Sequence, residues 1–475
     1  MFSLFVNHKY ADEAGVTIRL FFPGAKISRG LDMSNGLCVV SELRDDSAYA
    51  EISQDGNVLS KYAWPLSSNK GFLTYPRMLI LALFYALQDV KPTYAPWGAL
   101  TGIRPTKLVR EWLDSGLDDC DVVSTLKDPY CVTEEKAKLA LEVAKMEEMI
   151  AKRIIGISDK AIGFYINIPF CATRCHYCSF SCMDKPPTNE MQERYVDVLA
   201  KEIKEKVKLI KDKALVVSSI YIGGGTPTFL PENLLVKILL ALEDITSDKS
   251  IEFTVEGGRP DSVTKEKMSL LKKYGVNRFC VNSQTLNDNT LLAIGRKHTS
   301  DDFFKAFQIV RDAGIECVST DVIAGLPKET LFDMERTISG IVKLTPENIT
   351  VHNLAIKRAS KLKPGINDTD LPIAETVQKM LVLAQDFVKN AGYKPYYLYR
   401  QKDMVGLSEN VGYSKSEHWC HYNVGMMSEV QTVIGVGAGA VSKFVDGCKI
   451  TREFNVKNPE IYVARMVQRF SEGSK

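Results

Sequence analysis

The sequence lacks a long apolar run, and this absence is evidence about the location of the protein in the cell. Its longest such run, Met78–Leu87, is too short to span a bilayer, so we expect it to form a buried helix. The first ten residues, "MFSLFVNHKY", also lack the basic start of a secretory signal peptide and soon turn polar. These two absences predict a cytoplasmic protein with no membrane span.

An excess of charge of either sign is missing as well. The 475 residues carry a formal net charge of +2, and 25% of them are charged and 45% hydrophobic, as in ordinary folded proteins. This balance gives no reason to expect a nucleic acid as partner, although a local basic cluster can still bind an acidic small molecule. Tandem repeats and low-complexity tracts are absent too, so the length indicates two or three domains, or one large barrel with additions.

The pattern of apolar residues changes along the chain and predicts three regions. Residues 1–157 combine short strand-like runs with later helices, which predicts an α+β N-terminal domain. Residues 158–371 alternate apolar strands with helices, which indicates parallel strand pairing through helical crossovers. Residues 372–475 begin with the helix-like stretch "AETVQKMLVLAQDFVKNAG", and we expect a mainly helical C-terminal region with a mixed tail.

The middle region contains six strand–helix units, which are too few for a closed eight-stranded barrel. We therefore predict an α/β fold with an open, partial (β/α)6 barrel at its centre. The predicted strands are residues 163–170, 217–225, 251–257, 277–284, 315–326 and 347–356.

Three of the eleven cysteines lie close together in "CATRCHYC", and a fourth at matching spacing is missing. In a reducing compartment, such a cluster favours metal ligation over disulfides. Structural zinc usually takes four ligands, so a zinc site would need to borrow His176 or Cys182, and this alternative stays open. A [4Fe–4S] cluster held by only three thiolates instead leaves one iron open to an external ligand. We interpret the remaining cysteines as small apolar residues: Cys38, Cys120, Cys131, Cys280, Cys317, Cys420 and Cys448.

The cysteine motif resembles that of the radical S-adenosylmethionine (SAM) enzymes. "YINIPFC" and "GGGTPTFL" narrow the resemblance to the branch of oxygen-independent coproporphyrinogen III oxidases, and "WGALTGIRPTK" is similar to the longer, HemZ-type coproporphyrinogen dehydrogenases. The resemblance covers about residues 160 to 360. It implies that Cys171, Cys175 and Cys178 hold a [4Fe–4S] cluster. It also implies that the open iron of this cluster binds SAM, which is cleaved to a 5′-deoxyadenosyl radical.

The residues that the resemblance assigns to the cofactor follow successive strands of the predicted barrel. Ligand sites of such barrels form where the parallel strands end, so these side chains should meet. In "HNLAIKR", which contains Ala355, the chain departs from the chaperone branch of the family. We expect His298 on a helix surface, with a place beside the cofactor site as the alternative, and His418 and His421 on a loop near the barrel mouth. The implied SAM-binding residues are Tyr165, Tyr177, Gly224, Gly225, Thr226, Glu256, Gln284, Arg296, Asp321 and Ala355.

The implied reaction is the oxidative decarboxylation of two propionates of coproporphyrinogen III, which gives the vinyl groups of protoporphyrinogen IX. The partners would be the porphyrinogen substrate, an electron donor such as a flavodoxin or ferredoxin, and an electron acceptor. The resemblance assigns no catalytic side chain, and the N-terminal domain is hypothesised to cover the substrate. The anionic propionates need cations at the entry, for which the candidates are Lys357, Arg358, Arg400, Arg104, Lys107 and Arg110.

Other functions stay open on the same sequence. One is a haem-binding chaperone on the same barrel, which would bind porphyrin without converting it. A second is a non-catalytic iron–sulfur or zinc protein, and a third is a radical SAM enzyme that opens the porphyrin ring.

Overall fold

The computed structural model describes residues 2–30, 36–68, 73–102, 104–178, 186–248, 250–356, 360, 362, 370–401, 404–405, 408–447 and 449–472. The chain folds into two compact units, Met1–Glu142 and Val143–Lys475. The predicted boundaries after residues 157 and 371 stay predictions.

The first unit is an α+β domain, as its sequence predicts. Its sheet has the order β2-β1-β3-β4-β5, in which β1 lies parallel to β2 and β3, and the last three strands form an antiparallel meander. Helix α2 packs on β4 and β5 and buries most of the apolar run Met78–Leu87. The elements are β1 (Phe2–Val6), α1 (Ala11–Phe21), β2 (Ile27–Arg29), β3 (Leu37–Leu43), β4 (Ser47–Gln54), β5 (Asn57–Pro65), α2 (Tyr75–Val90), α3 (Pro105–Asp114), α4 (Asp119–Lys127) and the first part of α5 (Glu134–Ile157).

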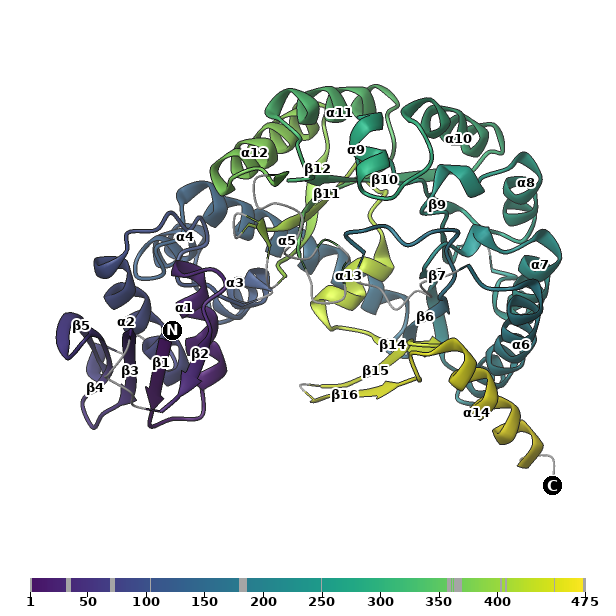
Figure 1. Ribbon diagram of the computed structural model, residues 1–475. Coiled ribbons are helices and arrows are strands. Elements are labelled where there is room, and N and C mark those ends of the chain that lie inside the picture. Colours follow the sequence, from purple (N-terminus) through teal and green to yellow (C-terminus); the bar gives the residue numbers. More distant parts are fainter. Residues whose placement is uncertain are drawn as a thin grey trace. The chain divides into compact units, whose positions relative to one another are not determined.

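The second unit is built on six parallel strands, and this confirms the partial barrel. The strands lie side by side in the order of the sequence, and the helices between them cover the outer side of the curved sheet (Figure 1). The strands are β6 (Ala161–Ile168), β7 (Val216–Gly224), β8 (Glu252–Glu256), β9 (Arg278–Cys280), β10 (Cys317–Ala324) and β11 (Asn348–Asn353). The helices are α6 (Asn189–Asp212), α7 (Glu232–Leu242), α8 (Lys265–Lys273), α9 (Asp288–Ala293), α10 (Ser300–Asp312) and α11 (Leu331–Lys343).

Capping boxes fix the start of two barrel helices, and with them the loops that follow the strands. The Thr299 side chain accepts a hydrogen bond from the Asp302 backbone, and the Asp302 carboxylate accepts one from the Thr299 backbone. Thr330 and Asp333 form the same reciprocal pair at the start of α11. Each pair satisfies backbone donors that the first helical turn would otherwise leave unbonded. The loops before α10 and α11 therefore end at defined points.

The C-terminal region extends the sheet at both ends. Its helices are α12 (Ala374–Asn390), α13 (His421–Ser428) and α14 (Pro459–Glu472). It also adds five strands that were not predicted individually: β12 (Lys394–Tyr399), β13 (Asn410–Ser414), β14 (Thr432–Val436), β15 (Val441–Asp446) and β16 (Lys449–Phe454). Strand β13 pairs antiparallel with β11 at one end of the barrel, and β14 pairs parallel with β6 at the other.

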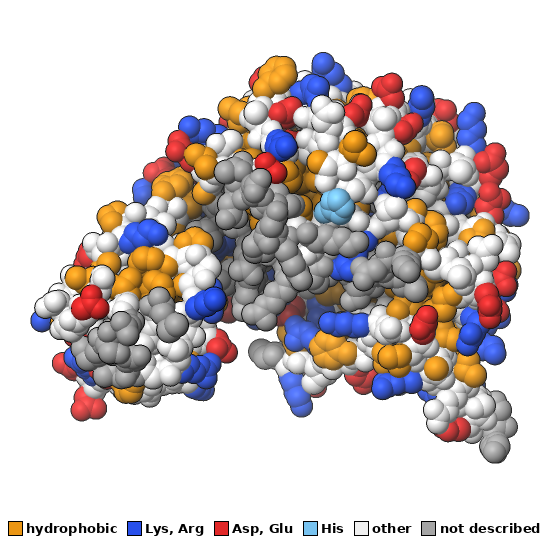
Figure 2. Space-filling model, in the orientation of Figure 1, with side chains coloured by type: hydrophobic (Ala, Val, Ile, Leu, Met, Phe, Trp, Pro, Cys, Tyr) orange, Lys and Arg blue, Asp and Glu red, His pale blue; other side chains and the backbone are white. Residues whose placement is uncertain are grey.

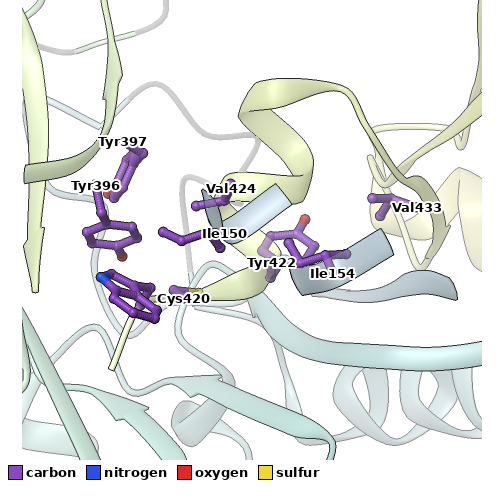
Figure 3. Close-up of a cluster of buried hydrophobic side chains, with 9 residues drawn as sticks. Ile150, Ile154, Tyr396, Tyr397, Cys420, Tyr422, Val424 and Val433 are labelled. Atoms are coloured by element: carbon purple, nitrogen blue, oxygen red, sulfur yellow. The ribbon is translucent and has the colours of Figure 1, made fainter. Parts of the chain in front are cut away.

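A cluster of buried side chains fills the space between the two ends of the curved sheet (Figure 3). Strands β12 and β14 lie on opposite sides of the parallel block, and the second half of α5 and helix α13 pack between them. Burying each large apolar side chain contributes roughly 1.5–3 kcal/mol, so this cluster stabilises the packing of α5 and α13 against β12 and β14. Its members are Ile150, Ile154, Tyr396, Tyr397, Trp419, Cys420, Tyr422, Val424 and Val433.

The surface shows no broad region of one charge on the face drawn in Figure 2, where acidic and basic side chains alternate over the barrel helices. This agrees with the small net charge of the sequence. Across the described ranges, the structure contains no helix with the length and apolar character that a membrane span requires.

Candidate functional site

A cavity of about 410 Å³ opens at the ends of the parallel strands in the second unit. Residues along β7, β8, β9, β10 and β11 line it, together with the loop that follows β6 and with residues of β12, β13 and α13. The carboxyl ends of parallel strands meet at one edge of a sheet, which is why these segments converge.

The cavity brings together most of the predicted residues. Tyr165 instead packs its ring against Tyr221, which lines the cavity, and donates its hydroxyl hydrogen bond to Asn167. Arg400 is not among the residues that line the cavity, and its Nε atom donates a hydrogen bond to the Ser408 carbonyl at 3.2 Å. Cys182, Lys357 and Arg358 lie outside the described residues. The predicted residues that line the cavity are Cys171, Cys175, Cys178, Tyr177, Gly224, Gly225, Thr226, Glu256, Gln284, Arg296, Asp321 and Ala355.

The glycine-rich loop after β7 lies directly against the segment that leads into the cysteines. The Gly225 amide donates to the Ile168 carbonyl at 2.7 Å, and the Thr226 amide donates to the Phe170 carbonyl at 2.7 Å. A Cβ atom on Gly224, whose φ is +107°, would collide with Asn167, and one on Gly225 would collide with the Phe170 backbone. Glycine is needed here because no side chain fits between the two loops. This close packing fixes the start of the cysteine loop.

Glu256 ends β8 as a desolvated carboxyl group in the cavity wall. Burial is the main cause that raises the pKa of Glu256 to about 7, and the nearby charge of Asp321 adds to it. A hydrogen bond from the Tyr221 hydroxyl acts in the opposite direction. An anionic Glu256 is therefore costly until a cation enters the cavity beside it.

Several buried polar atoms of the cavity wall have no hydrogen-bond partner within the described part of the chain. They include Gln284 Oε1, Arg296 Nε, Thr254 Oγ1 and Asn353 Oδ1. Gln284 also has a φ of +64°, a left-handed backbone conformation that is rare for a residue with a side chain. Buried polar groups are almost always bonded, so these atoms fit a polar ligand that supplies the missing donors and acceptors. The arrangement fits SAM, which carries ammonium, carboxylate and ribose groups.

Sequence reasoning missed part of the wall, although the strands carried a signal for it. Side chains alternate between the two faces of a strand, so polar residues at every second position of a buried strand face the same cavity. Strand β11 places Asn348, Thr350 and His352 in the wall in this way. His352 Nε2 lies 3.6 Å from Asp321 Oδ2, and its Nδ1 lies 3.4 Å from the hydroxyl of Tyr399 on β12. No signal pointed to Tyr399, because β12 joins the site only through the antiparallel addition to the sheet.

Two expectations about histidines have different outcomes. His298 is only 4% exposed, so its predicted place on a helix surface was wrong. Burial and then the charge of Arg296 lower the pKa of His298 to about 4, which keeps it neutral. His418 lies in a loop, as expected, but His421 does not: it is the first residue of helix α13, and its backbone amide donates to Glu252 at 2.8 Å.

The other cysteines are mostly buried, as predicted. Cys38, Cys280, Cys317 and Cys420 are buried, whereas Cys131 is half-buried, Cys120 is exposed and Cys448 lies outside the described residues. Among the described His, Cys, Asp and Glu side chains, no three converge as the ligands of one metal ion would. The three clustered thiols, Cys171, Cys175 and Cys178, all line the cavity.

Comparisons with known proteins agree with this geometry. Residues 165–340 match the radical SAM superfamily. The oxygen-independent coproporphyrinogen-III oxidase-like protein HemZ of Bacillus subtilis is 37% identical, and the match covers 78% of this chain and 74% of HemZ. The heme chaperone HemW of B. subtilis is 30% identical, over 59% of this chain and 74% of HemW.

One solved structure shows the same fold. It is that of the coproporphyrinogen III oxidase HemN from Escherichia coli, with a TM-score of 0.52, 21% sequence identity, and coverage of 68% of this chain and 72% of that one. The cysteine loop, the glycine-rich loop and the ends of the strands up to β10 all lie within the matched residues. The chain belongs to the radical SAM superfamily and, within it, to the group that includes HemZ and HemW.

Proposed function

We propose that the protein is a radical SAM oxidoreductase that converts coproporphyrinogen III to protoporphyrinogen IX without oxygen. The observation that carries the proposal is the convergence of three loop cysteines, the glycine-rich loop and unbonded polar atoms of the strand ends on one cavity. When bound, the [4Fe–4S] cluster and SAM supply a 5′-deoxyadenosyl radical that takes a hydrogen atom from a propionate carbon next to the ring. The remaining work is done by the chain itself.

In this proposal the chain holds the cofactors and orients the substrate. Cys171, Cys175 and Cys178 bind the cluster through their thiolates. Glu256 and Asp321 accept hydrogen bonds from the cationic and hydroxyl groups of SAM, and the unbonded atoms of Gln284 and Arg296 supply further partners. None of these residues needs to transfer a proton, because the carboxylate leaves as carbon dioxide.

The balance of the reaction defines what else must be present. Each propionate loses one hydrogen atom, one molecule of carbon dioxide and one electron, and the product is a vinyl group. An electron donor reduces the cluster at the start, and an acceptor takes the electron that the substrate releases. A flavodoxin or ferredoxin has the chemistry of such a donor.

The relatives support an oxidase over a chaperone, although both belong to the group. The match to HemZ extends over 78% of this chain, and the match to HemW extends over 59%. The additional coverage agrees with the presence of the N-terminal region, and the stretch "HNLAIKR" departs from the chaperone pattern.

Product analysis tests the proposal. Protein reconstituted with iron and sulfide under anaerobic conditions is reduced with dithionite and incubated with SAM and coproporphyrinogen III. We expect protoporphyrin after oxidation of the products, together with 5′-deoxyadenosine and methionine, and neither in the Cys175→Ala variant. Stable haem binding with no conversion would show a chaperone instead. A colourless protein without iron would exclude radical SAM chemistry.

A further inference from the structure

A buried arginine next to the cysteine loop has no part in the function proposed so far. Arg259 is 3% exposed and lines the cavity. Its Nη1 atom donates to the Thr173 hydroxyl at 2.6 Å, and Thr173 lies between Cys171 and Cys175. The Thr173 hydroxyl in turn donates to the Gly295 carbonyl at 3.3 Å. Arg259 thus connects the end of β8 to the middle of the cysteine loop.

Two glycines turn the chain so that Arg259 can reach this position. Gly258 has a φ of +62°, and the Arg259 amide donates to the Gly257 carbonyl at 2.5 Å across a tight turn. A Cβ atom on Gly257 would collide with the ring of Phe279. The stretch "EGGRP" therefore requires both glycines in order to place the arginine.

Two buried arginines and one carboxylate lie near the cysteine loop, so positive charge is in excess there. The Asp261 carboxylate binds the guanidinium through both oxygens, each at 2.9 Å. Burial opposes the charge of Arg259, but the hydrogen bonds and charge of Asp261, followed by the thiols of Cys175 and Cys171, outweigh it and raise the pKa of Arg259. Arg296 adds a second buried cation nearby, while His298 is neutral.

We propose that Arg259 is a positioning residue that holds the cysteine loop through Thr173 and raises the reduction potential of the iron–sulfur cluster by its positive charge. The inference rests on the proposed function, because it requires the cluster. Reduction adds one negative charge to the cluster, and a buried cation close to the thiolates stabilises that charge. Asp261 has the opposite effect, so the two residues set the potential in opposite directions.

The test compares the midpoint potentials of reconstituted variants by redox titration followed by electron paramagnetic resonance. Arg259→Gln keeps hydrogen-bond donors but removes the charge, and we expect a more negative potential. At a fixed solution potential the ratio of reduced to oxidised cluster should fall about tenfold, which equals ~59 mV for a one-electron couple. Asp261→Asn removes the opposing charge and should shift the potential to more positive values. Arg259→Lys keeps the charge and should stay near the wild type.

A matched control uses a second arginine–carboxylate pair in the same barrel. Arg311 binds both oxygens of Glu347, and neither residue is among those that line the cavity. Arg311→Gln should therefore leave the reduction potential of the cluster unchanged. Equal potentials in wild type, Arg259→Gln and Asp261→Asn would overturn the proposal. Shifts of both variants in the same direction would overturn it too, because a loosened cysteine loop would produce such shifts. If Arg259→Gln holds no iron, the potential of Asp261→Asn alone tests the proposal. An unchanged or a more negative potential in Asp261→Asn then overturns the proposal. Absence of a cluster in the wild type would refute the proposed function instead.

Discussion

The three loop cysteines can be tested one thiol at a time. Cys171, Cys175 and Cys178 line the cavity, and each should be needed for the cluster. We expect each alanine variant, after reconstitution, to lose most of its iron and its brown colour. Cys182, which lies outside the described residues, does not fit the spacing of the motif, so Cys182→Ala should keep both.

The exposed Cys120 provides the control for these variants. Its replacement by alanine removes a thiol without touching the cavity and should leave the iron content unchanged. Loss of iron in Cys182→Ala to the extent seen in Cys175→Ala would show that the set of three ligands is wrong.

Glu256 predicts how SAM binding depends on pH. Its pKa is raised to about 7 in the folded protein without ligand, so its anionic form becomes dominant only above that pH. SAM is cationic and should bind more tightly as pH rises through 7, with affinity falling by up to about tenfold per pH unit below it. The change in affinity can be measured by equilibrium dialysis between pH 6 and 8.5.

The Glu256→Gln variant separates this effect from the titration of SAM itself. Glutamine has nearly the same shape but no charge, so the variant should bind SAM weakly and lose the part of the pH dependence due to Glu256. The same raised pKa lowers the stability of the ligand-free protein as pH rises from about 4.5 to 7, because in this range the unfolded chain releases the Glu256 proton while the folded state still holds it. Identical pH profiles in wild type and variant would contradict the assignment.

At the scale of elements, the sequence predicted the six barrel strands because each is an apolar run of strand length between helices. The cysteine and glycine-rich motifs were identified by their spacing and their resemblance to a family, and their positions after predicted strands indicated that they would meet in one site. Strands β12–β16 were not predicted individually, since their places in the sheet depend on pairing with β11 and β6, far away in the sequence. Tyr399 was missed for the same reason. His298 was misplaced because its short loop shows no periodicity that would reveal its burial.

The buried side of the second half of helix α5 predicts an effect on stability. Ile150 is fully buried in the cluster that fills the space between β12 and β14. Ile150→Ala leaves a cavity and should lower the free energy of unfolding of the second unit by about 2–5 kcal/mol. Urea unfolding measures this change.

Lys152 on the same helix is the matched control. Its side chain is 74% exposed and pairs with Glu148 one turn away. Exposed pairs of this kind contribute little, so Lys152→Ala should change the free energy of unfolding by no more than about 0.5 kcal/mol. Similar losses in both variants would show that α5 does not stabilise the barrel through this buried cluster.

At the scale of the whole molecule, the second unit contains the cavity and all three cysteines of the motif, so we expect the residues that contact SAM directly to come from this unit. The first unit nevertheless carries a basic group at helix α3. Arg104 precedes the helix and is half-buried, Lys107 is exposed, and Arg110 is half-buried. Lys107 and Arg110 are three residues apart and therefore share one side of the helix. We hypothesise that this group binds a propionate of the porphyrinogen.

Removal of these charges should separate substrate turnover from SAM cleavage. An arginine binds a carboxylate through two parallel hydrogen bonds, and loss of such a contact in a desolvated site costs roughly 1.5–3 kcal/mol. The Arg104→Ala, Lys107→Ala double variant should therefore convert porphyrinogen about tenfold more slowly or worse, while SAM cleavage without substrate stays normal. Lys138→Ala, which removes an exposed lysine paired with Glu134 in the same unit, should change neither activity. Equal loss of both activities in the double variant would indicate misfolding, and loss of neither would show that these residues form an ordinary solvated surface.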